Sequence, residues 1–446
     1  MPHAYVIIFI MTVITAILAN IIPAGTFDRV EDASGNSVVV ADSFHHVDKI
    51  GCSIFDMFKS FQIGFEDSAQ IIFFIIFAYA FVYVLLKNGT FDALVGSVLR
   101  KVGNRIELII PVCMILFGLL GSTMGMFEET YGLIPVFISI AMALGYDAIV
   151  GGSVIYLGVA VGFAAATINP FTIGIAQEVA GVKMFSGLGY RILCFVVFMG
   201  ISIWYVWRYA RRIQKDPTKS YLYGEKIETL ECASREEMME IKMTTTHKLS
   251  CLLFVFTIGI LLYGTIKLGW YIDEIATLFI IMTIVSGLVS RFTPSEIADI
   301  FIEASKEMMY GALLVGISRS IAVIMENAQI IDTVVYWLAT MLQHFRGMAS
   351  AMGMLFAQNI INFFIPSGAG QALITMPILA PVGEMVGVSR QVSVLAYQFG
   401  DGFSNIFWPT SVFMMCGIMR LPINKWYRFV TPLFLIIFAA SIVLLG

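Results

Sequence analysis

The chain has 446 residues, of which 59% are hydrophobic and only 13% are charged, and its formal net charge is −4. A mean hydropathy of +0.86 excludes a soluble protein of this length, and many uncharged runs reach the roughly 20 residues that a helix needs to span a bilayer. We therefore expect an all-α polytopic membrane protein, because helices satisfy their own backbone hydrogen bonds in lipid. The sequence lacks the motifs of ATPases, serine hydrolases and zinc proteases, and nothing in it indicates a nucleic-acid partner.

The first 65 residues (1–65) are expected to contain one span, an outer loop and an interfacial helix. Ala4–Ile22 is apolar and lacks the basic start and the cleavage site of a signal peptide, so we expect it to be retained as a span. Residues 28–56 carry more acidic than basic side chains, which favours the outer side of the membrane. Ile54–Phe65 is amphipathic and is expected to lie along the interface.

Two regions, residues 66–208 and 298–446, show the same order of features. Each has a span, a basic or amphipathic connector, a second span, a polar break, a further apolar segment, a glycine-marked break and a proline. Between them, residues 209–248 are rich in Lys and Arg and are expected to form a cytoplasmic linker, and residues 249–297 add a span pair and an inner connector. The charged connectors orient the two regions oppositely, which is typical of an inverted-topology repeat. A coincidence of hydropathy is the alternative.

Polar interruptions lie inside sequence that is otherwise apolar enough for a membrane. The first region is interrupted at Gly121–Thr130, and a later apolar run ends at Asn169-Pro170. The second region is interrupted at Pro366–Gln371 and at Gly400–Asn405, ahead of Trp408-Pro409. Unwound backbone survives at bilayer depth only where protein or an aqueous cavity covers it. Re-entrant hairpins and broken helices build the substrate sites of secondary transporters, so we expect the site at these interruptions.

Three carboxylates, Glu128, Glu129 and Asp401, lie beside these breaks, and almost no basic residue accompanies them. Lys and Arg are absent from residues 106–182, and Arg390 is the only one in the matching part of the second region. A carboxylate at membrane depth costs free energy, so its presence there suggests a functional role. The excess of negative charge predicts an exogenous cation, which could be a proton, Na⁺ or a positively charged substrate. The alternative is that these side chains cap helix ends or face a wet vestibule.

Uncharged side chains and glycines at the breaks complete the candidate substrate site. Small residues and hydroxyls at a helix start leave free amides that accept a carboxylate, and side-chain oxygens suit Na⁺ or an amine. An indole could also stack on a guanidinium group. Close helix packing or an interhelical hydrogen bond is the alternative for each of them. The uncharged candidates are Ser122, Thr123, Asn169, Ser367, Gly368, Gly370, Gln371, Ser404, Asn405 and Trp408.

The site so assembled suits one class of ligand. Helix N-termini would hold an α-carboxylate while acidic side chains hold an amine or guanidinium, and together these describe a basic amino acid. Arg319 and Glu326 lie in another apolar region and are expected to form an internal pair, or helix-end charges, outside the site. A coupling Na⁺ would find oxygen ligands near Thr167, Asn169, Asp401 and Asn405.

Several motifs run from the chain start to the last break: Met1-Pro2-His3-Ala4-Tyr5, Ile22–Arg29, Pro366–Gln371, Met376-Pro377, Gly400–Asn405 and Trp408-Pro409. In these motifs the sequence resembles the YfcC family of bacterial membrane transporters, which is related to the DcuC C4-dicarboxylate carriers. Members of the family are described as basic amino-acid antiporters, some of them as arginine/ornithine exchangers. The resemblance implies two inverted repeats, each with a re-entrant helical hairpin and a broken helix. It also implies a homodimer in which an elevator-type transport domain moves against a scaffold.

The sequence therefore favours a secondary transporter of the bacterial inner membrane rather than an enzyme. We expect exchange of basic amino acids, as arginine for ornithine, with no cofactor and with Na⁺ or H⁺ as the candidate coupling ion. The expected partners are a small-molecule substrate, the lipid bilayer and a second copy of the chain. A Na⁺- or H⁺-coupled carrier of C4-dicarboxylates or other small organic acids is the closest alternative. A channel or an intramembrane enzyme is a third, although no nucleophile–base or metal constellation is visible in the sequence.

Overall fold

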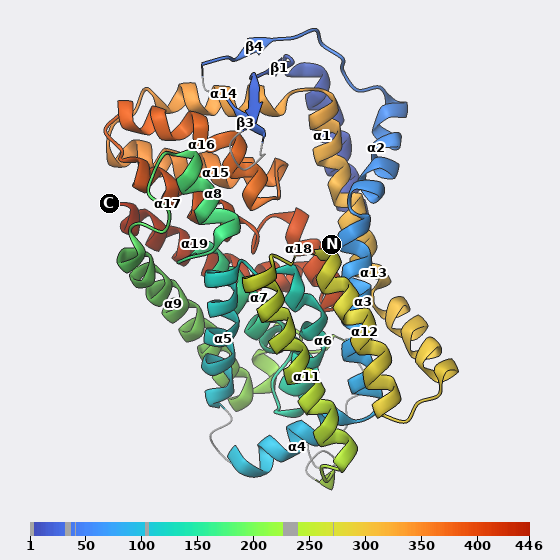
Figure 1. The fold of residues 1–446 in the computed structure, drawn as a ribbon. Helices are drawn as coiled ribbons and strands as arrows, with labels where there is room; N and C mark the ends of the chain where they lie inside the picture. The colour runs from blue at the N-terminus through green and yellow to red at the C-terminus, as the bar shows by residue number, and fades with distance from the viewer. Residues whose placement is uncertain (1–3, 32–36, 41, 103–106, 226–239, 271) are drawn as a thin grey trace.

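The structure, a computed structural model, is mostly helical (Figure 1). Within the part of the chain that it describes, four helices are long and apolar enough to cross a membrane, and one bent pair makes a fifth. Seven shorter apolar helices accompany them. The expected architecture of many apolar helices is therefore confirmed. The described residues are 4–31, 37–40, 42–102, 107–225, 240–270 and 272–446.

The first half of the chain runs from the N-terminus to the basic linker. Its break regions contain a 3-10 turn, η2, and a π-helical turn, η3, where the backbone changes direction. The elements are α1 (Ala4–Ile21), α2 (Ile54–Asp67), α3 (Ala69–Lys87), α4 (Thr90–Val102), α5 (Ile109–Met124), η2 (Glu128–Leu133), α6 (Ile134–Ala143), α7 (Ala148–Ala164), η3 (Pro170–Gly174), α8 (Ile175–Val179), α9 (Leu188–Lys215) and η4 (Pro217–Lys219).

The second half begins after the linker and contains α13, which at 34 residues is the longest helix among the described residues. Residues 226–239 in the middle of the basic linker, and Met1, Pro2 and His3 of the first family motif, lie outside the described residues. The elements are α11 (Thr245–Tyr263), η5 (Gly264–Leu268), α12 (Ile272–Val289), α13 (Pro294–Asn327), α14 (Ile331–Leu342), α15 (Met348–Phe364), α16 (Gly368–Met385), α17 (Arg390–Ser404), α18 (Pro409–Ile418) and α19 (Ile423–Leu445).

The expectation of helices alone needs one correction, because the loop after α1 contains two short antiparallel sheets. They pair β1 (Gly25–Thr26) with β4 (His45–His46), and β2 (Arg29–Glu31) with β3 (Ser37–Val39). Strands this short carry no alternating pattern that a sequence could display. The Arg29 guanidinium pairs with the Asp332 carboxylate at 2.8 Å, and that carboxylate also accepts the N–H of Phe27. These bonds fix the loop over α14, where Figure 1 places the strands.

Both halves present their elements in the same order. The first follows α3, α4 and α5 with a break, then α6, α7, a second break, α8 and α9. The second follows α13, α14 and α15 with a break, then α16, α17, a second break, α18 and α19. The order matches the sequence pattern, although four expected segment boundaries, after residues 65, 208, 248 and 297, fall inside helices.

Helix ends differ from expectation at the breaks themselves. Helix α5 continues to Met124, so that Gly121, Ser122 and Thr123 form its last turn and not a hairpin tip. Helix α17 continues to Ser404, so that most of the second expected break is helical and the chain unwinds only over residues 405–408. Likewise, α13 runs through the boundary expected at residue 297 between the inner connector and the second region.

Glycines in the sequence that looks like a break lie where these helices cross a neighbouring helix closely. A Cβ on Gly121 would lie 2.5 Å from the Val159 carbonyl oxygen of α7, and one on Gly400 would lie 2.6 Å from the Gln358 side chain of α15. A Cβ on Gly402 of α17 would collide with Ala164 of α7. These glycines therefore permit close helix crossings, as small residues do in membranes. The last of them joins the two halves of the chain beside the breaks.

Candidate functional site

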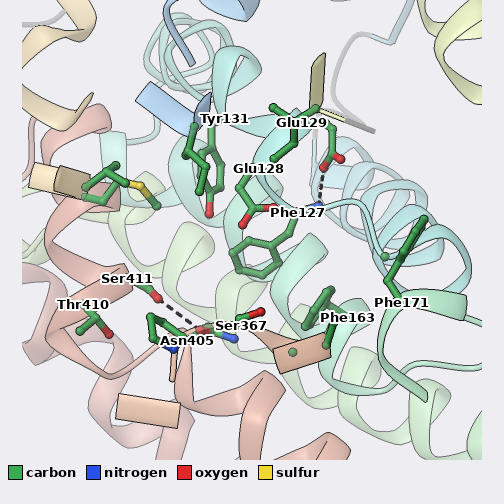
Figure 2. Close-up of a pocket in the computed structure, with 18 of the residues that line it drawn as sticks. Phe127, Glu128, Glu129, Tyr131, Phe163, Phe171, Ser367, Asn405, Thr410 and Ser411 are labelled. Carbon is green, nitrogen blue, oxygen red and sulfur yellow. Dashed lines mark hydrogen bonds between the residues drawn. The ribbon is translucent and has the colours of Figure 1, made fainter. Parts of the chain in front are cut away.

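The breaks of both halves meet around one cavity of about 360 Å³ (Figure 2). Its walls come from the turn between α5 and η2, the start of η3, the start of α16 and the start of α18. A further wall is formed by the end of α2, the start of α3, the start of α12 and by α13. The volume lies at the small end of the range typical of small-molecule sites, roughly 300–1,000 Å³. The interruptions that the sequence singles out are thus gathered around a space large enough for a metabolite.

Glu128 and Glu129 both line this cavity, but their side chains point in different directions (Figure 2). A Glu129 carboxylate oxygen accepts the backbone N–H of Phe127 at 2.8 Å, so it closes the turn that begins η2. Glu128 directs its carboxylate toward the space between the Phe127 and Tyr131 rings. No salt bridge in the described part of the chain involves either side chain. Glu128 is therefore the carboxylate available to a ligand.

The first-half breaks are tied to each other by short polar contacts. The Ser122 and Thr167 hydroxyls lie 3.0 Å apart, and the Thr167 N–H donates to the Ser122 carbonyl oxygen at 2.9 Å. Asn169 accepts the N–H of Phe171 at 2.9 Å and packs directly on Gly125, whose φ of 68° ends α5 in the left-handed conformation. These side chains fix the backbone conformation at the breaks. Gly125 and Phe171, whose backbone they contact, line the cavity.

The start of α16 supplies the opposite wall of the cavity. The Ser367 hydroxyl accepts the N–H of Gly370 at 3.2 Å and caps the helix. Gly368 is packed from two sides, because a Cβ there would lie 2.7 Å from the Thr172 side chain and 3.3 Å from Asp401 Oδ2. Ser367 and Gly368 line the cavity, so the free N-terminal amides of this helix are within reach of a ligand there.

Asp401 is completely buried directly behind this helix start. Its Oδ1 accepts the Asn362 amide N–H at 2.6 Å, and the Ser404 hydroxyl donates to Asn362 Oδ1 at 2.6 Å, which fixes the orientation of that amide. Its Oδ2 has no hydrogen-bond partner among the described residues. A buried carboxylate with one open oxygen and no basic partner in this part of the structure suits a monovalent cation.

The four residues expected near a Na⁺ ion fall into two groups. Thr167 and Asn169 are bonded at the first-half breaks, whereas the Asn405 amide donates to the Asp401 carbonyl oxygen at 3.1 Å. Asn405 also accepts the Ser411 hydroxyl at 3.2 Å, which Figure 2 shows on the cavity wall. No group of three or more His, Cys, Asp or Glu suited to a metal ion occurs in the described part of the chain.

Three further expected residues have partners inside the protein and do not line the cavity. The Gln371 amide donates to Gln358 on α15, and the Trp408 indole N–H donates to the Asn359 carbonyl oxygen at 2.7 Å. The Thr123 hydroxyl donates back within its own helix. These three residues therefore make hydrogen bonds within or between helices, which is the alternative to a direct role in binding. They affect the site only by holding the helices that surround it.

The structure adds one charged residue that sequence reasoning placed outside the site. Arg319 lines the cavity, and its guanidinium pairs with Glu326 at 3.1 Å and with Asp67 at 3.4 Å. The expected pair of Arg319 with Glu326 is therefore confirmed. The expectation that Arg319 lies outside the site is wrong, because α13 passes along the cavity. Asp67 also lies on the wall and was not singled out. The polar residues around it, Ser68 and Gln70, are the only sequence signal that could have found it.

The cavity wall as described carries an excess of negative charge. Three carboxylates, those of Asp67, Glu128 and Glu129, line the cavity together with one guanidinium, that of Arg319. Asp401 adds a further carboxylate behind Gly368. Within a low-dielectric membrane domain, such an excess attracts a cationic ligand.

A family model described as "DcuC: C4-dicarboxylate anaerobic carrier" matches residues 1–446. The chain belongs to this family. An Escherichia coli (strain K12) relative named "Putative basic amino acid antiporter YfcC" is 31% identical over 490 residues, with 100% of this chain and 96% of the relative covered. A Haemophilus influenzae relative described as an uncharacterized protein is 28% identical over 399 residues, with 89% and 78% covered. The family resemblance expected from the motifs is therefore confirmed, and the chain is a multi-pass membrane protein of a transporter family.

Two solved structures are similar to the chain as a whole. The Alcanivorax borkumensis YdaH transporter has a TM-score of 0.45 and 16% identity, with 100% of this chain and 98% of that chain covered. Neisseria gonorrhoeae MtrF, whose structure is described as illuminating a class of antimetabolite efflux pumps, has a TM-score of 0.43 and 18% identity, with 100% and 94% covered.

Proposed function

We propose that this family member is a secondary active transporter that exchanges basic amino acids, such as arginine for ornithine, across the bacterial inner membrane. The observation that carries the proposal is the cavity where the breaks meet, whose wall holds more carboxylates than basic groups. The name of the 31% identical Escherichia coli relative is consistent with this substrate class. No catalytic chemistry is needed for this function.

The two ends of a basic amino acid have complementary groups in the cavity. Glu128, which makes no salt bridge within the described chain, would bind the guanidinium or side-chain amine. Two groups on the cavity wall would accept the carboxylate: the N-terminal amides of α16 at Gly368 and Ala369, and the guanidinium of Arg319. A ligand with both charges would therefore be held between the two halves of the chain.

Exchange rather than free return of the empty carrier follows from the cost of uncompensated charge. The empty cavity carries unpaired carboxylates, and moving them through the bilayer without a cation is unfavourable. We propose that two inverted repeats provide the two access states and that an elevator-like transport domain moves against a scaffold. The equal order of elements in the two halves supports the repeat. A homodimer with residues 209–248 in the cytoplasm completes the proposal.

The coupling ion is assigned to Asp401 in this proposal. Its open Oδ2 faces Gly368, so a Na⁺ ion or proton there would touch the same helix start that lines the substrate cavity. Occupancy of Asp401 would thereby influence the position of Ser367 at the cavity wall. Na⁺ and H⁺ are separated by varying each gradient alone.

Counterflow in proteoliposomes tests the proposed function. Purified protein is reconstituted with ornithine inside and trace labelled arginine outside, with and without Na⁺ and a pH gradient. Arginine uptake that requires internal ornithine supports a basic amino-acid exchanger. Absence of uptake under all conditions, in vesicles that transport another substrate, refutes it.

A Na⁺- or H⁺-coupled carrier of C4-dicarboxylates is the second candidate. The family description and the guanidinium of Arg319 on the cavity wall favour it. In that case the carboxylates would bind the coupling cation while Arg319 and the start of α16 bind the substrate. Labelled succinate exchanged against internal succinate, in the same vesicles, distinguishes the two candidates.

A further inference from the structure

A second charged subsite lies on the cavity wall formed by α13. Arg319 is the only Lys or Arg among the described residues that line the cavity. A cation on a helix at membrane depth is costly, and its retention indicates a role. Its side chain is 32% exposed, so the guanidinium is reachable from the cavity and is not sealed inside the protein.

Two carboxylates hold the Arg319 guanidinium in one orientation. Asp67 lies at the end of α2, and its Oδ2 is 3.4 Å from Arg319 Nε. Glu326 lies on α13 like Arg319, and its Oε1 is 3.1 Å from Arg319 Nη2. Nη1 makes no hydrogen bond to any described residue, so its two N–H groups are available. A guanidinium that is already oriented loses little entropy when it binds a carboxylate.

An independent observation lies next to it on the same helix. The Ser318 side chain is more than nine-tenths buried and lines the cavity, yet its hydroxyl has no hydrogen-bond partner in the part of the chain described. Buried hydroxyls are nearly always bonded, so an unsatisfied one on a cavity wall marks the place of a missing acceptor or donor. A carboxylate between Ser318 Oγ and Arg319 Nη1 would satisfy both groups.

We propose that Arg319 and Ser318 form the subsite for the carboxylate of the substrate. The inference rests on the proposed function and refines it, because it makes the substrate an α-amino acid with a cationic side chain and excludes the corresponding carboxylate-free amine. The amine or guanidinium is held by Glu128, and the carboxylate is held by Arg319. The carrier would thus distinguish arginine from agmatine, its decarboxylated form, although both carry the guanidinium.

Competition against labelled arginine in the ornithine-loaded vesicles tests this subsite. For the wild-type protein, agmatine and L-argininamide are expected to compete at least about tenfold more weakly than arginine, since a hydrogen bond to a charged group is lost. Equal competition by the three compounds would overturn the proposal, and this arm requires no variant that must fold.

Four variants then locate the effect. Arg319→Gln should lower the affinity for arginine to that for agmatine and leave the affinity for agmatine unchanged. Arg319→Lys should retain part of the preference for arginine over agmatine. Ser318→Ala loses no internal hydrogen bond, so it should fold normally and weaken arginine by about two- to fivefold while agmatine is unaffected. Arg390→Gln is the matched control, because Arg390 pairs with Glu384 at 2.9 Å and does not line the cavity.

An unchanged arginine-to-agmatine ratio in Arg319→Gln, or an equal loss of both ligands, overturns the subsite while arginine counterflow still supports the exchanger. If the wild-type protein does not move arginine at all, the proposed function fails and the subsite is tested with labelled succinate. Succinate uptake must then fall at least tenfold in Arg319→Gln, and unaltered uptake would reject the subsite.

Discussion

Neutralising Glu128 separates a substrate-binding role from a structural one. Glu128→Gln removes one charge at nearly constant size from a side chain that makes no salt bridge within the described chain. Glu129→Gln makes the same change at the neighbouring residue, whose carboxylate accepts the Phe127 N–H at 2.8 Å. The two variants therefore form a matched pair that differs only in what the side chain faces.

The two substitutions are expected to change the KM for arginine to clearly different extents. A hydrogen bond to a charged group contributes about 1.5–3 kcal/mol, so the KM of Glu128→Gln for arginine should rise about 10- to 100-fold. In Glu129→Gln the amide oxygen still accepts the Phe127 N–H. That variant should lose about 1 kcal/mol of stability or less and keep its KM within about threefold.

Initial rates of arginine counterflow over a concentration series give both KM values, and melting temperatures in detergent report folding. A normal KM in Glu128→Gln, in protein that melts like the wild type, would refute the assignment of the cation subsite. Equal effects of the two substitutions would refute the distinction between the side chains, since only one of them is bonded to the turn.

Three further outcomes are expected. Gly368→Ala should abolish transport in folded protein, because the new Cβ would lie 2.7 Å from a side chain of η3. Gly189→Ala is the control and should transport normally, because open space surrounds Gly189. Uptake is compared between the two variants, each reconstituted at the same amount of protein. Asp401→Asn should remove the dependence of uptake on Na⁺ or on pH, and a dependence equal to that of the wild type would contradict the ion assignment. Asp332→Asn breaks the pair with Arg29 and should lower the free energy of unfolding by about 1–3 kcal/mol while transport stays normal, which a melting curve and an uptake assay check together.

Periodicity and composition were sufficient to predict that the chain is built of apolar helices. The expected first span, Ala4–Ile22, is helix α1, which runs from Ala4 to Ile21. Apolar runs of this length have no other stable form in lipid, so the sequence alone carries that information. The breaks were placed one turn early, because glycine and serine residues in α5 and α17 read as interruptions while tertiary packing keeps them helical.

The sequence by itself determined that the chain is a helical membrane protein of a transporter family, with carboxylates beside unusual breaks. Only the tertiary structure decided which of those carboxylates are free, because that depends on which groups the fold places beside each one. Glu129 accepts the Phe127 N–H of its own turn, whereas Asp401 is held by Asn362 of another helix. It also decided that Arg319, which a linear reading separates from the breaks by dozens of residues, shares their cavity. The charge and polarity of a segment follow from its own sequence. Which face of a helix lines the cavity is set by packing across the whole fold.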